Sequence, residues 1–288
     1  MMAERPRLSA DPRAAAARHP ALFQRVTRAR IATVLVIIAM LALFALGIVM
    51  LEFDARRFFQ GLFRLGEFVV FMVPPSTGNW ATFLIYLHAL AETVAIALLG
   101  TLLAAVPAIV FGFLAAKNVV PQFLIHFLSR RVLDTVRGVD ELIWALIWVN
   151  VVGLGPFAGI LAVASANFGA FGKLFSEAIE AADPKPVEGV VSAGGGRLAA
   201  VRFGLWPQVA PVIASQVLYY FESNTRSATI IGIVGAGGIG LHLAEQIRTL
   251  EFQHVSALVL MILATVAVID WLSTMLRFSI IGRRETVG

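Results

Sequence analysis

The chain has 288 residues, of which 59% are apolar and only 14% are charged, and its mean hydropathy is +0.84. Because a soluble globular domain carries about 25% charged residues, this composition excludes an ordinary soluble protein and indicates an integral membrane protein. The chain has no cysteine, which excludes a disulfide framework and a thiolate metal or redox site.

The N-terminal third predicts a tail, an anchor and a surface segment. Residues 1–30 consist largely of alanine, arginine and proline without an apolar stripe, so we expect a disordered basic tail. Residues 31–51 are apolar for long enough to cross about 30 Å of hydrocarbon. This run lacks the small-residue cleavage site of a removed signal peptide and should stay as an anchor. Residues 52–82 are rich in phenylalanine but broken by charges, which favours an amphipathic segment on the outer interface. A docking surface for an external protein is the alternative.

Further apolar runs predict an all-α polytopic bundle of about six spans. Gly153, Gly155 and Pro156 interrupt an apolar stretch that is too long for one helix, and they indicate a tight turn between two spans. Six crossings would put both ends of the chain on the same side of the membrane. The five spans expected after the first are residues 86–115, 139–153, 157–175, 207–232 and 255–276.

The net charge of +5 comes from basic residues at the edges of the apolar runs, which suits lipid headgroups and membrane topology better than nucleic acid. Most of the arginine and lysine lies in the N-terminal tail, in the loops after the second and fourth predicted spans, and at the C-terminal end. By the positive-inside rule these segments face the cytoplasm. We therefore expect a multi-pass membrane protein with both termini in the cytoplasm, including a short tail at 283–288.

A polar, glycine-broken loop at 177–207 is the most distinctive cytoplasmic feature. Asp183 followed by Pro184 is a good helix start. The glycines at 194–196 should end this first short helix, a second should follow from Arg197, and Pro207 should turn the chain into the membrane. Two short helices joined by a glycine bend form a compact projection that fits a cleft on another protein. An ordinary helical hairpin at the membrane interface is the alternative.

The spacing of Glu188, Gly194 and Pro207 resembles the E-A-A, then G, then L-P loop of ABC importer permeases. The flanking segments SEAIEAADPKPVEG and YFESNTRSATIIGIVGAGGIG, together with DELIWALIWVNVVGLGPFAGILA, are similar to the permease subunit of phosphonate ABC importers. The resemblance covers roughly residues 85–280, which is most of the chain.

The resemblance implies a type I ABC importer permease (MetI-like) fold with a transmembrane core at 83–282. It implies a protein of the bacterial inner (plasma) membrane that moves phosphonate or a related phosphorus oxyanion into the cytoplasm. It also implies a homodimer of this permease, two cytoplasmic ATPase subunits and an external or periplasmic substrate-binding protein. The loop would then couple the permease to the ATPases. Its candidate residues are Glu188, Gly194, Gly195, Gly196, Arg197 and Pro207.

Two motif tests bear on catalysis. The chain contains no G-x-x-x-x-G-K-[ST] motif, so we expect no ATP hydrolysis and no cofactor of its own, with ATP bound by a partner subunit. Residues 235–240 satisfy G-x-G-x-x-G, the pattern of dinucleotide sites. That motif should follow a strand, whereas here it ends a membrane span, so small residues that let helices approach closely are the better interpretation.

Charges inside the apolar runs are expensive, at about 2.5–3.5 kcal/mol each near the bilayer centre, and should face protein or water. Glu222 and Arg226 are four residues apart on one helix, a spacing that favours an ion pair. The pair has two interpretations: an internal salt bridge that fixes helix packing, or a site where Arg226 guides an anion. The candidate path residues are Glu222, Asn224, Arg226 and Thr229. We expect structural roles for Glu92, Asp140, Glu141, Asn150 and Asp270, with contact to substrate as the alternative for each. Asp140 and Glu141 should lie near the start of a span, and Asp270 or Glu92 should bond a neighbouring helix.

Other functions remain as alternatives. An ABC importer permease for another small solute would share every feature above. A secondary transporter needs inverted repeats, and none is evident in the sequence. A membrane enzyme needs a convergent set of acids, bases or metal ligands, but the histidines are scattered without paired spacing.

Overall fold

The computed structural model describes residues 28–281, and every regular element in that range is a helix. The chain divides into two compact units, residues 1–66 and 67–288, which are described separately below. The expected disorder of the N-terminal tail falls mainly on residues 1–27, and the expected cytoplasmic tail on 283–288. Both lie outside the described residues.

The first unit contains α3 (Arg28–Met50) and the beginning of α4 (Ala55–Phe71). Residues Ile31–Met50 of α3 are long and apolar enough to cross a membrane, which agrees with the predicted first span. Asp54 begins α4, and its Oδ1 accepts the Arg56 amide hydrogen at 2.8 Å. The amphipathic pattern of α4 agrees with the predicted surface segment, while its place on the outer interface stays a prediction.

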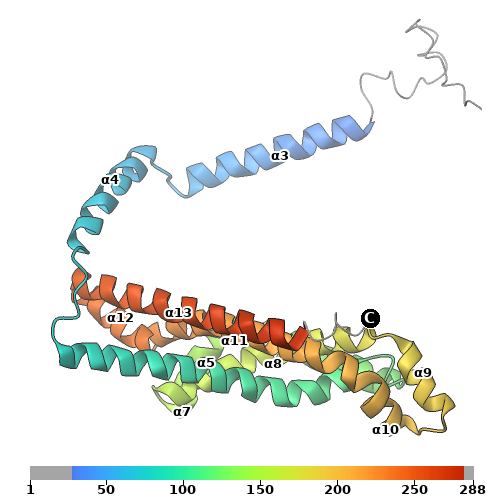
Figure 1. Ribbon diagram of the computed structural model, residues 1–288. Helices are drawn as coiled ribbons and strands as arrows, with labels where there is room; N and C mark the ends of the chain where they lie inside the picture. The colour runs from blue at the N-terminus through green and yellow to red at the C-terminus, as the bar shows by residue number, and fades with distance from the viewer. Residues whose placement is uncertain (1–27, 282–288) are drawn as a thin grey trace, which may run out of the picture. The chain divides into compact units, whose positions relative to one another are not determined.

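Four long helices form the second unit, and Figure 1 shows them lying alongside one another. They are α5 (Trp80–Ala115), α8 (Pro156–Glu180), α11 (Trp206–Ile233) and α13 (Phe252–Ile281). α5, α8 and α13 each meet the length and hydropathy expected of a span. α11 has 28 residues but is more polar, because its second half carries the sequence ESNTRSAT.

Small residues set the distance between α5 and α8. A Cβ added to Gly112 of α5 would lie 2.9 Å from the Phe175 Cβ of α8, and one added to Gly100 would lie 2.6 Å from the Val163 Cβ. The two contacts have the same sequence offset, so the two helices run in the same direction. Close approach of the helices is therefore possible because these positions have no side chain.

Two shorter helices, α6 (Phe123–Arg137) and α7 (Glu141–Val152), pack against α8 in succession. Leu133 of α6 faces Gly172, and the Trp148 Nε1 of α7 donates to the Ser165 Oγ at 3.0 Å. The predicted span at 139–153 is wrong in its extent, because α7 has only 12 residues and the return between the parallel helices α5 and α8 is made by α6 and α7 together. At 1.5 Å per residue α7 rises about 18 Å, short of a 30 Å core. Asp140 caps its start and Gly153, with φ of +93°, ends it.

The remaining elements lie at opposite ends of the long helices (Figure 1). α12 (Ile239–Arg248) follows the glycine-rich turn after α11. α9 (Pro184–Ser192), α10 (Arg197–Ala199) and the π-helix η1 (Ala200–Leu205) connect α8 to α11 at the other end.

Candidate functional site

The predicted loop is a compact helical hairpin, and its first arm is α9. The Asp183 Oδ1 accepts the Lys185 amide hydrogen at 3.0 Å, which caps the helix as predicted from the Asp-Pro pair. The helix ends where Gly194 adopts φ of +87°, a conformation that glycine reaches without steric cost. The Gly195 amide then donates to the Val190 carbonyl at 2.9 Å. The predicted glycine bend is therefore confirmed.

The second arm, α10 with η1, touches the first arm through its backbone. A Cβ added to Gly204 would lie 2.7 Å from the Val187 Cα, so no larger residue fits at this crossing. Gln208 joins both ends of the hairpin: its Nε2 donates to the Asp183 and Gly204 carbonyls at 3.1 and 2.7 Å. Its Oε1 accepts the Asp183 amide hydrogen at 3.1 Å. The sequence analysis missed Gln208, because a single glutamine after a proline has no recognisable pattern.

The hairpin surface combines charge with exposed apolar side chains. Glu188 and Arg197 line a hollow of about 750 Å³ between the hairpin and the segment 116–121. Leu198 is 83% exposed, Phe203 64% and Val191 55%. Exposed apolar residues beside a hollow of this kind are typical of protein interaction sites. The glycines of the tip lie on the same exposed surface, and Pro207 stands in the first turn of α11.

The root of the hairpin is fixed to the bundle at the end of α8. The Glu180 Oε1 accepts from the Lys117 amide at 2.8 Å and from the Arg130 Nη2 at 2.7 Å. The Asn118 Nδ2 donates to the Ile179 carbonyl at 2.8 Å. The root of the hairpin therefore contacts α6 and the residues that follow α5, as well as the two helices that the hairpin connects.

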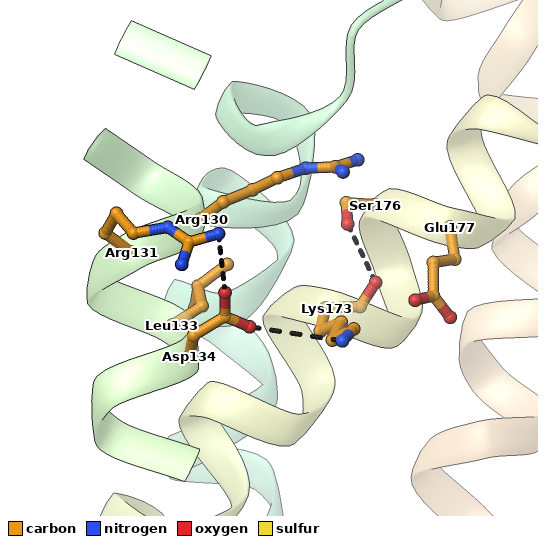
Figure 2. A pocket seen from close by; sticks show the side chains of 7 residues that line it. All are labelled: Arg130, Arg131, Leu133, Asp134, Lys173, Ser176 and Glu177. Atoms are coloured by element: carbon orange, nitrogen blue, oxygen red, sulfur yellow. Dashed lines mark hydrogen bonds and ion pairs between the residues drawn. The ribbon is translucent and has the colours of Figure 1, made fainter. Parts of the chain in front are cut away.

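A second charged cluster holds α6 against α8 around a pocket of about 160 Å³. Figure 2 shows Asp134 between two cations, with Arg131 Nη2 at 3.3 Å and Lys173 Nζ at 4.0 Å from its two oxygens. The side chains of all three are at least 39% exposed. Exposed pairs of this kind contribute about 0–1 kcal/mol each, so the cluster orients α6 more than it stabilises the bundle.

The predicted pair between Glu222 and Arg226 is present, but Glu222 has a closer partner. Its Oε1 lies 3.6 Å from the Arg226 Nη2, and its Oε2 lies 3.0 Å from the Nη2 of Arg277 on α13. Glu222 is 8% exposed, whereas the Arg226 side chain is 53% exposed. The carboxylate thus links α11 to α13. Arg277 was missed because it is 55 residues further along the chain, beyond any local spacing rule.

The other candidate path residues bond within the bundle. The Asn224 Nδ2 donates to the Thr101 Oγ1 of α5 at 2.8 Å, and the Thr229 Oγ1 donates to the Thr225 carbonyl at 3.3 Å. The structure therefore does not bring Glu222, Asn224, Arg226 and Thr229 onto one exposed face, and Arg226 alone of these four is exposed. A transport role for them stays a prediction.

The glycine-rich turn before α12 packs closely against neighbouring helices. The Glu92 Oε1 accepts the Gly238 amide hydrogen at 2.9 Å, and the Thr93 Oγ1 accepts that of Ile239 at 2.8 Å. A Cβ added to Gly232 would lie 2.5 Å from the Gly237 carbonyl oxygen. Close approach of helices explains these glycines, as predicted, and Glu92 bonds a neighbouring helix as expected.

Comparisons with known proteins identify the family to which this chain is similar. Residues 108–281 match the family model described as a binding-protein-dependent transport system inner membrane component. The chain is 37% identical over 248 residues to a putative phosphite transport system permease protein of Stutzerimonas stutzeri, with 86% of this chain and 87% of that protein covered. It is 38% identical over 229 residues to a phosphate-import permease protein of Mycolicibacterium smegmatis, covering 80% of this chain and 43% of that protein.

A solved structure shares the fold. A crystal form of the MetNI methionine ABC transporter in an inward-facing conformation superimposes with a TM-score of 0.62 at 14% identity, covering 70% of this chain and 99% of that one. At this level of identity the likeness concerns the fold alone. The expected MetI-like, all-α architecture is confirmed.

Proposed function

The chain belongs to the family of binding-protein-dependent transport system inner membrane components, and we propose that it is the permease subunit of an ATP-driven importer for phosphonate or a related phosphorus oxyanion. The names of its relatives, a phosphite transport permease and a phosphate-import permease, support this substrate class. The resemblance of residues 85–280 to phosphonate permeases points to the same substrate class.

The hairpin of α9, α10 and η1 is the coupling element that docks into a cytoplasmic ATPase subunit. The observation that carries this assignment is the exposed apolar surface of Val191, Leu198 and Phe203 beside the hollow lined by Glu188 and Arg197. Apolar anchors within a polar rim are what a protein partner buries. Because Glu180 ties the root of the hairpin to α6 and to the residues that follow α5, movement of the ATPases would shift several helices together.

The proposed assembly has two copies of this permease, two ATPases and an external or periplasmic binding protein. A two-fold axis between the permeases would place one pathway at the interface. ATP is bound by the partner, and this chain is neither an enzyme nor the holder of a cofactor. The hairpin and both termini face the cytoplasm, in agreement with the distribution of arginine and lysine.

Uptake by a reconstituted complex tests the function. Liposomes would contain the permease with its ATPase, and the binding protein would be added outside together with phosphite, methylphosphonate or phosphate. We expect uptake of at least one phosphorus oxyanion that requires both ATP and the ATPase subunit. Uptake without ATP would indicate a secondary transporter. Uptake restricted to solutes without phosphorus would contradict the proposed substrate class.

Coupling is tested by Glu188→Lys, which reverses a charge on the docking surface. We expect the inserted complex to lose stimulation of ATP hydrolysis by the loaded binding protein, because the reversed charge disfavours the docked state. Glu188→Gln removes the charge at nearly constant size and should lose less. Full stimulation in the Glu188→Lys complex would contradict the assignment of this hairpin.

A further inference from the structure

Arg137, the last residue of α6, is an exposed cation beside the bundle. A Cβ added to Gly169 would lie 2.7 Å from the Arg137 amide nitrogen, so Arg137 lies level with the middle of α8. Within residues 28–281, no hydrogen bond or ion pair is formed by its guanidinium. Arginine stays protonated in proteins, so this position carries a full, uncompensated positive charge.

The neighbouring cations differ from Arg137 because each has a carboxylate. Arg130 pairs with Glu180 at 2.7 Å, and Arg131 and Lys173 share Asp134 (Figure 2). An unpaired charge beside a helix of membrane-spanning length faces water or an anion, because lipid does not solvate it.

The part of α11 near Arg137 carries polar groups at the edge of the core, where the Tyr220 ring packs on Phe171 with 4.8 Å between ring centroids. Tyr220 lies within electrostatic range of the Arg137 guanidinium, and Ser227, two turns further along α11, lies beside the Glu141 carboxyl. The helical period places Gln216 and Ser223 on the same side of α11 as these two. The four residues form one stripe, which we call the α11 polar stripe: Gln216, Tyr220, Ser223 and Ser227.

Two oxygen atoms at this stripe lack partners. The Gln216 Oε1 and the Glu141 Oε1 are both buried without a hydrogen-bond partner in the described range, although the Glu141 carboxyl does take a hydrogen bond from Ser227. A buried acceptor without a donor is costly, at about 1–3 kcal/mol, and is usually satisfied by water or a ligand. Around Tyr220 the stripe therefore offers hydroxyl donors, an unpaired guanidinium and the free acceptor of Gln216, while Ser227 and Glu141 lie about 16 Å further along α11 than Gln216.

This set of groups matches a singly protonated phosphorus oxyanion. A guanidinium donates two parallel hydrogen bonds to two oxygens of such an ion. The hydroxyls of Tyr220 and Ser223 can donate to the anionic oxygens, and a P–OH group can donate to the Gln216 Oε1. We propose that Arg137 and the α11 polar stripe form a station that holds the phosphorus oxyanion during its passage through the permease. The inference rests on the proposed function and names residues for its pathway.

A purely structural role for Arg137 predicts a different result for its variants. A cation in the last turn of a helix favours the helix by about 0.3–1 kcal/mol through the dipole. Under that role, Arg137→Gln would lower thermal stability slightly, and uptake per folded complex would be unchanged.

The test measures uptake and substrate-stimulated ATP hydrolysis per folded, assembled complex, together with the midpoint of thermal unfolding. We expect Arg137→Gln to slow uptake about tenfold or more, the loss that a missing charged hydrogen bond produces. Arg137→Lys should keep part of the rate. The matched control is Arg131→Gln, an exposed arginine of the same helix, which should stay within about twofold of wild type.

Gln216→Leu is the second variant, because function and stability should move in opposite directions. It removes the buried oxygen that has no partner, so thermal stability should hold or rise. Uptake should nevertheless fall, since the P–OH acceptor is lost. A purely structural Gln216 would leave uptake unchanged.

The outcomes separate this inference from the proposed function. Wild-type uptake in both Arg137→Gln and Gln216→Leu, in a complex that does import a phosphorus oxyanion, would overturn the station alone. The station would also be overturned if Gln216→Leu had normal uptake and the lower uptake of Arg137→Gln were explained by failed assembly. A wild-type complex that imports no phosphorus oxyanion overturns the proposed substrate and the station together.

Discussion

Two glycine-rich connections join helices of this protein, and they differ in how much space surrounds their glycines. At the hairpin tip, a Cβ added to Gly194 or Gly196 would meet no atom within 4 Å. In the turn before α12, a Cβ on Gly237 would lie 2.7 Å from the Glu92 Oε1, and one on Gly240 would collide with the Thr229 carbonyl oxygen. Both connections contain glycines in the left-handed region of the backbone, namely Gly194 at the tip and Gly235, Gly237 and Gly238 in the turn. The second connection needs, in addition, the absence of side chains inside a packed junction.

This difference agrees with a binding role for the hairpin and a structural role for the turn at 234–240. The hairpin arms are joined by Gln208 and by the contact at Gly204, and their apolar side chains remain exposed. The turn at 234–240 is tied to α5 by Glu92 and Thr93 and is largely buried. The exposed apolar side chains of the hairpin are available to a partner, whereas the buried junction keeps α11, α12 and α5 in register.

The largest effect is expected for Gly240→Ala. The added methyl group forces α12 away from Thr229 and from Gly232, whose Cα would lie 2.9 Å from it. Overpacking of this kind costs about 1–3 kcal/mol or more, so the yield and the unfolding midpoint in detergent should both fall. Gly196→Ala is the control at an open position. Equal stability of the two variants would remove the distinction between the two connections.

Gln208→Ala should have an intermediate and local effect. It removes three hydrogen bonds that join the hairpin ends, each with a net value of about 0.5–1.5 kcal/mol. Hydrogen exchange should accelerate in residues 184–205 and stay unchanged in α5 and α13. Uniform acceleration across all helices would show that the hairpin is not a separately held element.

The smallest effects are expected at the tip. Gly194 has φ of +87°, so Gly194→Ala should cost about 1–2 kcal/mol of local strain. Gly196 has φ of −72°, which alanine adopts freely, and Gly196→Ala should be neutral or stabilising by about 0.4–1 kcal/mol. Thermal unfolding of both variants checks the order, and a more stable Gly194→Ala would reverse the conformational explanation.

Local chemistry made the hairpin predictable. Asp183, Pro184 and the tip glycines are helix signals that act within a few residues, and the structure has both arms where they indicated. The i, i+4 rule likewise predicted the pair of Glu222 and Arg226.

Contacts between distant segments were not predictable in this way. Gln208 acts on residues 25 positions away, and Arg277 on one 55 positions away. The end of α7 after 12 residues shortened an expected span, because hydropathy reports only how apolar a segment is. No sequence pattern marks Arg137 as a site residue, because its proposed role depends on its position beside the middle of α8 and near polar groups of α11.

The most direct test of the central claim, that the hairpin docks into an ATPase, uses single cysteines, which is possible because the chain has none. Leu198→Cys places a thiol on the docking surface, and Thr249→Cys places an exposed control at the opposite end of the bundle. Labelling by a membrane-impermeant maleimide is compared in vesicles of both orientations, with and without the ATPase. We predict that Leu198→Cys is labelled only from the cytoplasmic side and is protected by the bound ATPase, while Thr249→Cys is labelled only from outside and is unaffected. Labelling of Leu198→Cys from outside, or at full rate with the ATPase bound, would contradict the account.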